Sequence, residues 1–205
     1  MATGTVINRS FYARDTLTVA KELLGKVLVH GSREGETSGA IVEVEAYVGE
    51  SDPACHASHG YTTRNAPLYG QAGQAYVYLN YGVHHLLNAV TESEGFPAAV
   101  LIRAVEPIGG LSLMAQRRKG SGASTVLGEV ERAALCRGPG NLSRAFGITL
   151  VQNRLDLTAS RLLIVDQGRS VGPIKWTGRV GIREGTDRTW RCFAAANACV
   201  SRPSF

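Results

Sequence analysis

Two glutamates and a tyrosine alternate along one apolar stretch of the chain, at Glu43, Glu45 and Tyr47. The other residues of 41–48 are apolar, so the stretch is predicted to be a β-strand whose side chains alternate between two faces. One face is apolar and must be buried, while the other carries Ile41, both carboxylates and the phenol. That second face is either a wet acidic surface or the wall of a site in which a carboxylate acts as a general base.

The loop after this strand brings two further reactive side chains, Cys55 and His56. Together with His59 they resemble a metal cluster, but no second pair of ligands follows at the spacing of a zinc site. We therefore expect no metal ion and no other cofactor.

One arginine lies inside an almost uninterrupted apolar run, residues 98–107, which is predicted to be a central strand ended by Pro107. A guanidinium is rarely buried without a partner, and the carboxylates of Glu43 and Glu45 are the obvious partners for Arg103. The pattern leaves open whether such a pair is purely structural or part of a site.

Aromatic residues gather around a predicted hairpin. Tyr76 and Tyr78 share one face of a strand, a turn signal follows at residues 80–82, and the chain returns as a strand over residues 85–91. Tyr81 therefore lies at or beside the tip, where a large ring has little core to join. It either packs on a neighbouring loop or serves as a wedge between stacked nucleic-acid bases.

The charge is unevenly distributed along the chain. Residues 115–205 hold 15 Lys and Arg against 6 Asp and Glu, whereas residues 1–114 hold 7 against 11. A basic half suggests a polyanionic partner such as nucleic acid, and an arginine-rich solvated surface is an equal alternative. The loop 62–65 could donate to phosphate oxygens, and the helix expected over 111–119 ends in three cations. A Gly-rich turn into a helix capped by Asn141 is a weaker phosphate candidate.

The remaining segments supply the frame. Residues 11–25 are predicted to form one helix, with Asp15 at its N-cap and Gly25 after its end, followed by a hairpin that leads into the strand of Glu45. A short helix and three further strands are expected at 130–136, 162–165, 175–182 and 190–200. No repeat or linker interrupts the chain, so residues 1–205 are interpreted as a single domain.

Several classes of protein fit the sequence poorly. No apolar run approaches the ~18 residues of a membrane span, and the N-terminus lacks the apolar core of a signal peptide. Four cysteines without a CxxC pair do not make a disulfide framework, so reduced thiols fit better. We expect a soluble monomer inside the cell, in the cytoplasm or nucleoid or in a nucleus.

Short blocks along nearly the whole chain resemble the alkyladenine (3-methyladenine) DNA glycosylase family. Each block alone is weak, but their number and order make the resemblance specific. The blocks are residues 14–17, 23–26, 41–47, 56, 63–65, 76–82, 88, 100–107, 135–139, 179–181 and 200–201. The resemblance implies an α+β fold, a single mixed domain with a curved antiparallel sheet, flanking helices and a protruding β-hairpin.

The resemblance also implies a role for each matching residue. Glu45 would activate the hydrolytic water, while Arg103 and the backbone carbonyl of Val180 would help to hold that water. Tyr81 would fill the gap that a flipped base leaves in the duplex. Four residues would line the pocket around that base or screen it: Tyr47, His56, Tyr78 and Asn88. Apart from the resemblance, the polar loop and the basic helix end suggest DNA-backbone contacts by Thr63, Arg64 and Arg118.

The implied activity is hydrolysis of the N-glycosidic bond of alkylated or deaminated purines in double-stranded DNA, which initiates base excision repair. The candidate lesions are 3-methyladenine, 7-methylguanine, hypoxanthine and etheno-adenine, and Asn88 would exclude guanine by a clash with its amino group. A strand-cleaving lyase would need an activated amine. The chain has four lysines and none lies in the site segments, so a monofunctional glycosylase is expected.

The sequence departs from the family pattern at two places, and two other protein classes are alternatives to a glycosylase. The chain has Val83-His84-His85 and Cys192 where bulkier apolar or aromatic residues are common. A non-catalytic nucleic-acid-binding module would use Tyr81 as a wedge, but it would not need a carboxylate on a buried strand. A carbohydrate hydrolase needs two carboxylates flanking the scissile bond, whereas Glu43 and Glu45 would lie on the same side of a sugar.

Overall fold

The computed structural model describes residues 4–120, 122 and 127–201. Its strands form one antiparallel sheet that does not close. They are β1 Thr5–Val6, β2 Val27–Ser32, β3 Gly35–Val48, β4 Ala75–Asn80, β5 His84–Val90, β6 Ala98–Gly109, β7 Leu162–Asp166, β8 Ile174–Thr177 and β9 Arg191–Ala194. The helices are α1 Arg9–Tyr12, α2 Thr16–Leu23, α3 Leu111–Lys119, α4 Glu129–Ala134 and α5 Pro139–Phe146, with 3₁₀ turns η1 Ala66–Tyr69 and η2 Leu150–Gln152. The predicted α+β fold is confirmed.

The sheet is built around its longest strand, β3. The strand order is β1-β7-β2-β3-β6-β5-β4, so β6 runs along one edge of β3. The other edge pairs with β2 over residues 35–40 and with β9 over residues 43–45. Strands therefore flank Glu43 and Glu45 on both sides, and both side chains are fully buried. The wet acidic surface is excluded.

A bulge interrupts the alternation predicted for β3. Its pairing with β6 is irregular between Ile41 and Val44. Ile41 packs with Val44 and Ala46 in the main core, whereas Val42 belongs to a separate cluster with Ala104. The strict two-face division of residues 41–48 is therefore wrong, because a β-bulge shifts which residues face the core.

The helix predicted over residues 11–25 is two helices. Asp15 caps α2 as predicted, since its carboxylate accepts the N–H of Thr18 at 2.8 Å. Asn8 caps α1 in the same way, through the N–H of Phe11. A capping residue leaves the helical conformation, so Asp15 divides the segment instead of starting one long helix.

Three other boundaries differ from the prediction. α5 begins at Pro139 behind Gly138, so Asn141 lies inside the helix and is not its cap. β6 continues past Pro107 as far as Gly109. β8 and β9 are short, and residues 178–190 between them form a loop. Polar groups of this loop bind residues of other segments, among them Asp52 and Glu45.

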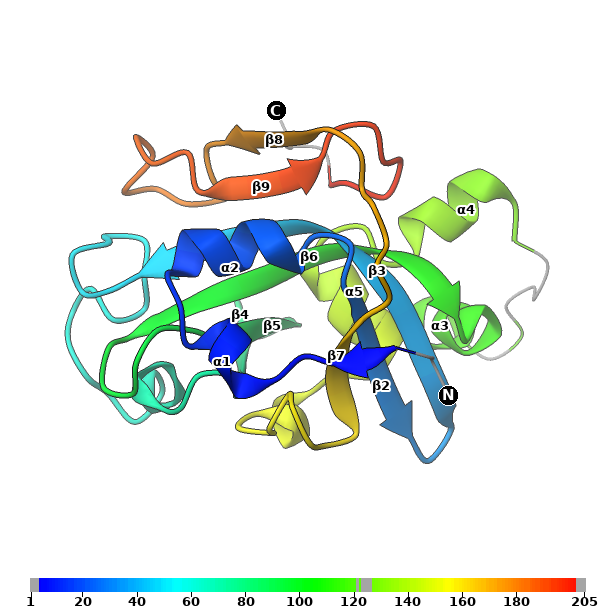
Figure 1. Cartoon of the computed structure of the whole chain (residues 1–205). Helices are drawn as coiled ribbons and strands as arrows, with labels where there is room; N and C mark the ends of the chain where they lie inside the picture. Colours follow the sequence, from blue (N-terminus) through cyan, green and yellow to red (C-terminus); the bar gives the residue numbers. More distant parts are fainter. Residues whose placement is uncertain (1–3, 121, 123–126, 202–205) are drawn as a thin grey trace.

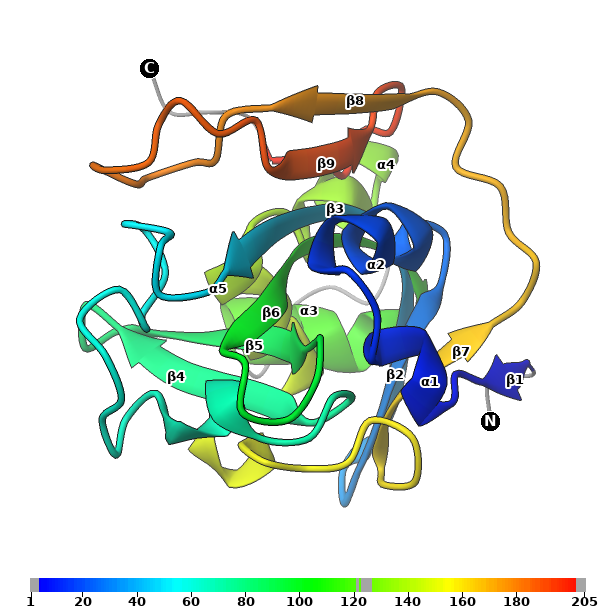
Figure 2. The ribbon, with the colours of Figure 1, turned by 60° about the vertical axis from the view of Figure 1, so that its left-hand side comes forward.

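Three segments meet on one side of the molecule, and one of them is distant in the sequence from the other two. They are the loop after β3, the β4–β5 hairpin and the loop between β8 and β9, all on the left of Figure 2. α2 lies against β3 and β6, and the β8–β9 hairpin runs at the top of both views (Figures 1 and 2). The central strands thus present their polar side chains between these loops.

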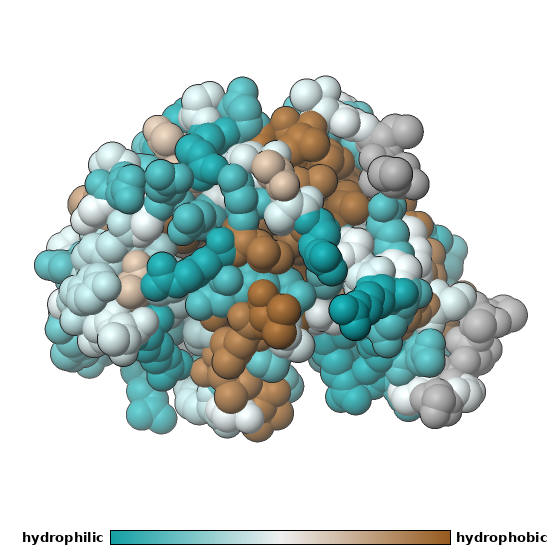
Figure 3. Space-filling view, turned by 90° about the horizontal axis from the view of Figure 1, so that it is seen from below, coloured by the Kyte–Doolittle hydropathy of each residue, from teal (hydrophilic) through white to brown (hydrophobic). Residues whose placement is uncertain are grey.

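A second face of the molecule is partly apolar. Seen from below, hydrophobic residues gather in patches between strongly polar ones (Figure 3). Leu150 and Val151 of η2, which lies at the bottom of Figure 1, are exposed apolar side chains. No residue of η2 lines the cavity described below, so this surface is separate from the candidate site.

Among the described residues, the cysteine and histidine side chains form neither a disulfide nor a metal-binding cluster. All four cysteines are free and buried, in agreement with the reduced thiols that the sequence favours. Within the described part of the chain, no group of three or more His, Cys, Asp and Glu side chains is placed to hold a metal ion. No described helix combines the length and the apolar character that crossing a bilayer requires.

Candidate active site

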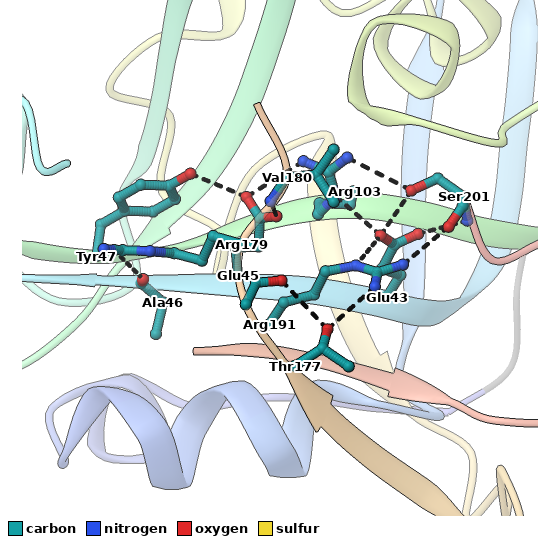
Figure 4. Close-up of polar contacts among 11 residues, drawn as sticks. Glu43, Glu45, Ala46, Tyr47, Arg103, Thr177, Arg179, Val180, Arg191 and Ser201 are labelled. Atoms are coloured by element: carbon teal, nitrogen blue, oxygen red, sulfur yellow. Dashed lines mark hydrogen bonds and ion pairs between the residues drawn. The ribbon is translucent and has the colours of Figure 1, made fainter. Parts of the chain in front are cut away.

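Glu45 is held by three donors from three different elements. Its Oε1 accepts the backbone N–H of Val180 at 2.7 Å, and its Oε2 accepts the hydroxyl of Tyr47 at 2.9 Å. Nη1 of Arg103 lies 3.2 Å from the same Oε2 (Figure 4). These contacts leave Oε1 with one free acceptor position, because each carboxylate oxygen accepts about two hydrogen bonds.

Glu43 has a different environment although it lies only two residues away. Its oxygens accept Nε of Arg103 at 2.9 Å, Nε of Arg191 at 2.7 Å, and both the N–H and the hydroxyl of Ser201 at 2.6 Å. Burial acts to raise the pKa of Glu43, but the two arginines and Ser201 outweigh burial and lower it. The carboxylate is therefore ionised, with three of its four donors on Oε1 and one on Oε2.

Arg103 bridges the two glutamates, as the sequence predicted. Nε binds Glu43 and Nη1 faces Glu45, so a structural pair and a site contact coexist in one side chain. Burial alone would lower the pKa of Arg103, but the charges of Glu45 and Glu43 raise it. Glu43 thus holds the guanidinium of Arg103 in place, and the guanidinium in turn holds Glu45.

A buried ion pair that the sequence reasoning missed places Val180 beside Glu45. Both nitrogens at the end of Arg179 bind the carboxylate of Asp52, at 2.5 and 2.7 Å, and Nη1 also donates to the carbonyl of Ala46 at 3.0 Å. Neither charged side chain is exposed. The pair ties residues 178–184, called the strap below, to the loop after β3. Asp52 escaped notice because an aspartate after a strand is also an ordinary turn residue.

An open cavity of about 670 Å³ lies in front of this cluster. All four residues predicted for the base pocket line it, together with Arg103, Val180 and Tyr81: Tyr47, His56, Tyr78 and Asn88. Glu45 is fully buried behind the wall that Tyr47, Arg103 and Val180 form. The structure therefore brings the predicted catalytic and pocket residues into one place, with the carboxylate just below the cavity surface.

The aromatic walls are neutral hydrogen-bonding groups. Burial and then the charge of Glu45 raise the pKa of Tyr47 well above its usual value and that of Tyr78 to about 12, so both phenols keep their protons. Partial burial and the nearby charge of Arg64 lower the pKa of His56. Nδ1 of His56 lies 2.8 Å from the hydroxyl of Tyr76, which fixes the ring.

Asn88 and Tyr81 stand at opposite ends of the β4–β5 hairpin. Asn88 is buried and its amide donates to the backbone carbonyl of Tyr76 at 3.0 Å. Tyr81 is 85% exposed at the tip, with a φ of 47°, a left-handed conformation that non-glycine residues rarely adopt. The predicted exposed aromatic is confirmed, and the backbone holds it under strain.

The candidate phosphate donors differ in their exposure and in whether other residues already bind them. Thr63 and Arg64 are exposed. Asn65 is buried, and its side chain binds Thr62, His56 and Gly60 within the loop, so it is not available as a phosphate donor. Arg118 at the end of α3 donates to Oδ1 of Asn141, and its buried Nε has no acceptor.

Other proteins are similar in sequence to this chain over most of its length. A family model described as methylpurine-DNA glycosylase matches residues 10–198. A protein of Sodalis glossinidius is 46% identical over 191 residues, which cover 93% of this chain and 98% of the relative. A protein of Methanocella arvoryzae is 44% identical over 200 residues, covering 96% of each chain. Both are named 3-methyladenine DNA glycosylases, and both names mark the assignment as inferred. The chain belongs to the methylpurine-DNA glycosylase family.

Proposed function

We propose that this protein is a monofunctional DNA glycosylase that hydrolyses the N-glycosidic bond of alkylated or deaminated purines in double-stranded DNA. One observation carries the proposal: a buried carboxylate, Glu45, is held by Arg103 and the N–H of Val180 directly behind an aromatic cavity. The candidate lesions are 3-methyladenine, 7-methylguanine, hypoxanthine and etheno-adenine. The product is a free base and an abasic site, the starting point of base excision repair.

The chemistry requires little more than one placed carboxylate. Cleavage of a base from deoxyribose passes through an oxocarbenium-like state, which a nearby negative charge stabilises. The free acceptor position on Oε1 of Glu45 takes a proton from water, and such general-base assistance is worth roughly 10²–10⁴-fold. Tyr47 and Arg103 hold Oε2, so they keep Oε1 directed at the water. The contact of Val180 with Glu45 is made by its N–H, and its carbonyl is proposed as a further acceptor for the same water.

The cavity suits a flipped purine. Extruding a base costs a few kcal/mol, which favours damaged or mispaired bases. Stacking on an aromatic side chain recovers about 1–3 kcal/mol per base, and Tyr47, His56 and Tyr78 offer such surfaces. Asn88 is proposed to exclude guanine through a collision with its exocyclic amino group, and the support for this role is that its amide lines the cavity and is fixed by the carbonyl of Tyr76.

DNA is proposed to lie across the side of the molecule on which the hairpin tip projects. Tyr81 would enter the duplex and occupy the place of the extruded nucleotide. Thr63, Arg64 and Arg118 would contact phosphates, and the exposure of Thr63 and Arg64 supports that role for these two residues. Such contacts make binding sensitive to salt. We propose a monomer as the acting form.

The test is release of free base from methylated and hypoxanthine-containing duplexes. We expect release without strand cleavage, because no lysine is among the described residues that line the cavity. A lyase would instead nick the strand at the abasic site. A protein that binds these duplexes but releases no base from any of them would be a nucleic-acid-binding module, and the proposal would be wrong.

Replacing Tyr81 by asparagine is expected to separate stability from activity. Asparagine tolerates the left-handed conformation, whose strain costs a tyrosine about 1–2 kcal/mol, so the free energy of unfolding should stay the same or rise. Base release from duplex DNA should fall by roughly 10- to 100-fold, because the stacked wedge is lost. Urea unfolding and single-turnover release measure the two effects.

The matched control for this change is Tyr81→Phe, which keeps the ring and loses only the hydroxyl. It should release base at nearly the rate of the wild type. Equal losses for both variants would show that the hydroxyl, and not stacking of the ring, is the group that matters.

A further inference from the structure

Arg64 stands against the outside of the aromatic wall. Its Nη2 donates to the backbone carbonyl of Leu79 at 3.1 Å, and its guanidinium carbon lies 5.9 Å from the centroid of the Tyr78 ring. Tyr78 lines the cavity and Arg64 does not. The cation therefore lies over the Tyr78 ring but outside the set of residues that line the cavity.

The position of Arg64 is built into the loop that carries it. The buried side chain of Asn65 accepts the N–H of Thr62 at 2.6 Å and donates to the carbonyls of His56 at 2.9 Å and Gly60 at 2.8 Å. These bonds tie the turn of Arg64 to the segment that supplies His56 to the cavity. The guanidinium is thus presented to the pocket edge by a fixed turn.

The charge of Arg64 is not matched by a carboxylate, in contrast to those of its neighbours. Arg103 and Arg191 are paired with Glu43, and Arg179 with Asp52. Among the contacts of the described residues, Arg64 makes no ion pair. Its charge also acts on a side chain that lines the cavity. After burial, the charge of Arg64 is the second cause of the lowered pKa of His56. In the free protein, Arg64 therefore places beside the pocket a positive charge that pairs with no carboxylate among the described residues.

We propose that Arg64 sets the lesion preference of the pocket by disfavouring positively charged bases relative to neutral ones. This inference rests on the proposed function. Bases alkylated at a ring nitrogen, such as 3-methyladenine, carry a positive charge, whereas hypoxanthine is neutral. A cation on one face of Tyr78 repels a second cation stacked on the other face and weakens the attraction of the ring for it.

The size of the effect follows from the distance. A base stacked on the far face of Tyr78 would carry its charge on the order of 10 Å from the guanidinium, which changes the relative stability of a cationic base by a factor of roughly 2 to 15 at effective dielectric constants of about 80 to 20. Removal of the charge should therefore raise the rate for the cationic lesion relative to the neutral one by about this factor.

The experiment compares Arg64→Gln with the wild type in single-turnover release of 3-methyladenine from a methylated duplex and of hypoxanthine from an otherwise identical duplex. Enzyme is kept saturating, because the maximal rate does not then depend on duplex affinity. The loop keeps its anchor without the arginine, because Asn65 holds the turn through Thr62, His56 and Gly60. We expect the ratio of the 3-methyladenine rate to the hypoxanthine rate to rise roughly 2- to 15-fold.

Two controls sharpen the result. Arg64→Lys retains the charge and should leave the ratio near that of the wild type. Arg169→Gln removes an equal charge from an exposed position in the loop after β7, from which no described residue reaches the cavity, and should also leave it unchanged. A rise in the ratio for Arg64→Gln alone supports the proposal.

An unchanged ratio for Arg64→Gln would overturn the inference. This includes the case in which both rates fall together, because a pure phosphate contact would affect both lesions alike. The proposed function fails in a different way, since the wild type would then release neither base. The two failures are therefore distinguished by the wild-type reaction alone.

Discussion

Replacing Glu45 by glutamine is expected to lower the rate of base release by roughly 10²–10⁴-fold, because an amide cannot take a proton from water. Glutamine keeps the size of the side chain, and its carbonyl oxygen can still accept the N–H of Val180. Duplex binding should therefore persist. Single-turnover release from methylated and hypoxanthine duplexes, beside a fluorescence anisotropy titration of the same duplexes, measures both quantities.

The control for this change is Glu50→Gln, on the loop that follows the same strand. Glu50 is exposed and accepts a hydrogen bond from the hydroxyl of Tyr69, away from the cavity lining. Its replacement should leave base release within about twofold of the wild type, as is usual for exposed polar side chains. If Glu45→Gln retained a similar rate, Glu45 would not be the general base, even with the glycosylase activity intact.

Replacing Glu43 by glutamine is expected to act on stability and to lower the free energy of unfolding by about 3–5 kcal/mol, the usual cost of removing one partner from a buried ion pair. Two buried guanidiniums, those of Arg103 and Arg191, would lose their carboxylate, and the bonds to Ser201 would be disturbed. Urea unfolding at neutral pH measures this loss. Activity should fall in proportion to the folded fraction and to any displacement of Arg103.

Acid unfolding supplies a second measurement for the same residue. The pKa of Glu43 is lower in the folded protein than in the unfolded chain, since its arginine and serine partners outweigh burial. Its contribution to stability is therefore complete above the unfolded value of about 4.3 and is lost as the pH falls below that value towards the folded pKa. The Glu43→Gln variant should lack this part of the acid transition.

Glu34→Gln provides the comparison for Glu43→Gln. Glu34 also pairs with an arginine, Arg117, at 2.7 Å, but its side chain is 66% exposed. An exposed pair is worth about 0–1 kcal/mol, so this variant should unfold nearly as the wild type does. Equal losses for the two variants would contradict the assignment of Glu43 as the buried anchor of the site.

The contrast between the two glutamates explains how one strand can hold both an anchor and the proposed general base. Glu43 lies where β3 meets β9 and the segment of Ser201, and four donors of the protein bind its carboxylate. Glu45 lies next to the cavity wall and retains an acceptor position. This arrangement also removes the carbohydrate-hydrolase alternative, because Glu43 is not free to serve as a second reacting carboxylate.

Local sequence signals were enough to predict the strand of Glu45, the pairing of Arg103 with it and the exposed ring of Tyr81. Alternation, apolar runs and turn residues act over a few neighbouring residues, and their physical basis does not depend on the rest of the chain. A buried arginine needs a carboxylate, so its partner could also be predicted without coordinates. The resemblance to the glycosylase family added the reaction and the pocket residues.

Only the tertiary structure decided how these residues are held. Arg179 and Asp52 are 127 residues apart, and Ser201 binds Glu43 across 158 residues, so no periodic pattern connects them. The bulge in β3 arises where the local alternation of the strand meets its pairing with β6. The burial of Glu45 likewise depends on β9 and the strap closing over the strand, because packing between distant segments determines which polar side chains lose contact with water.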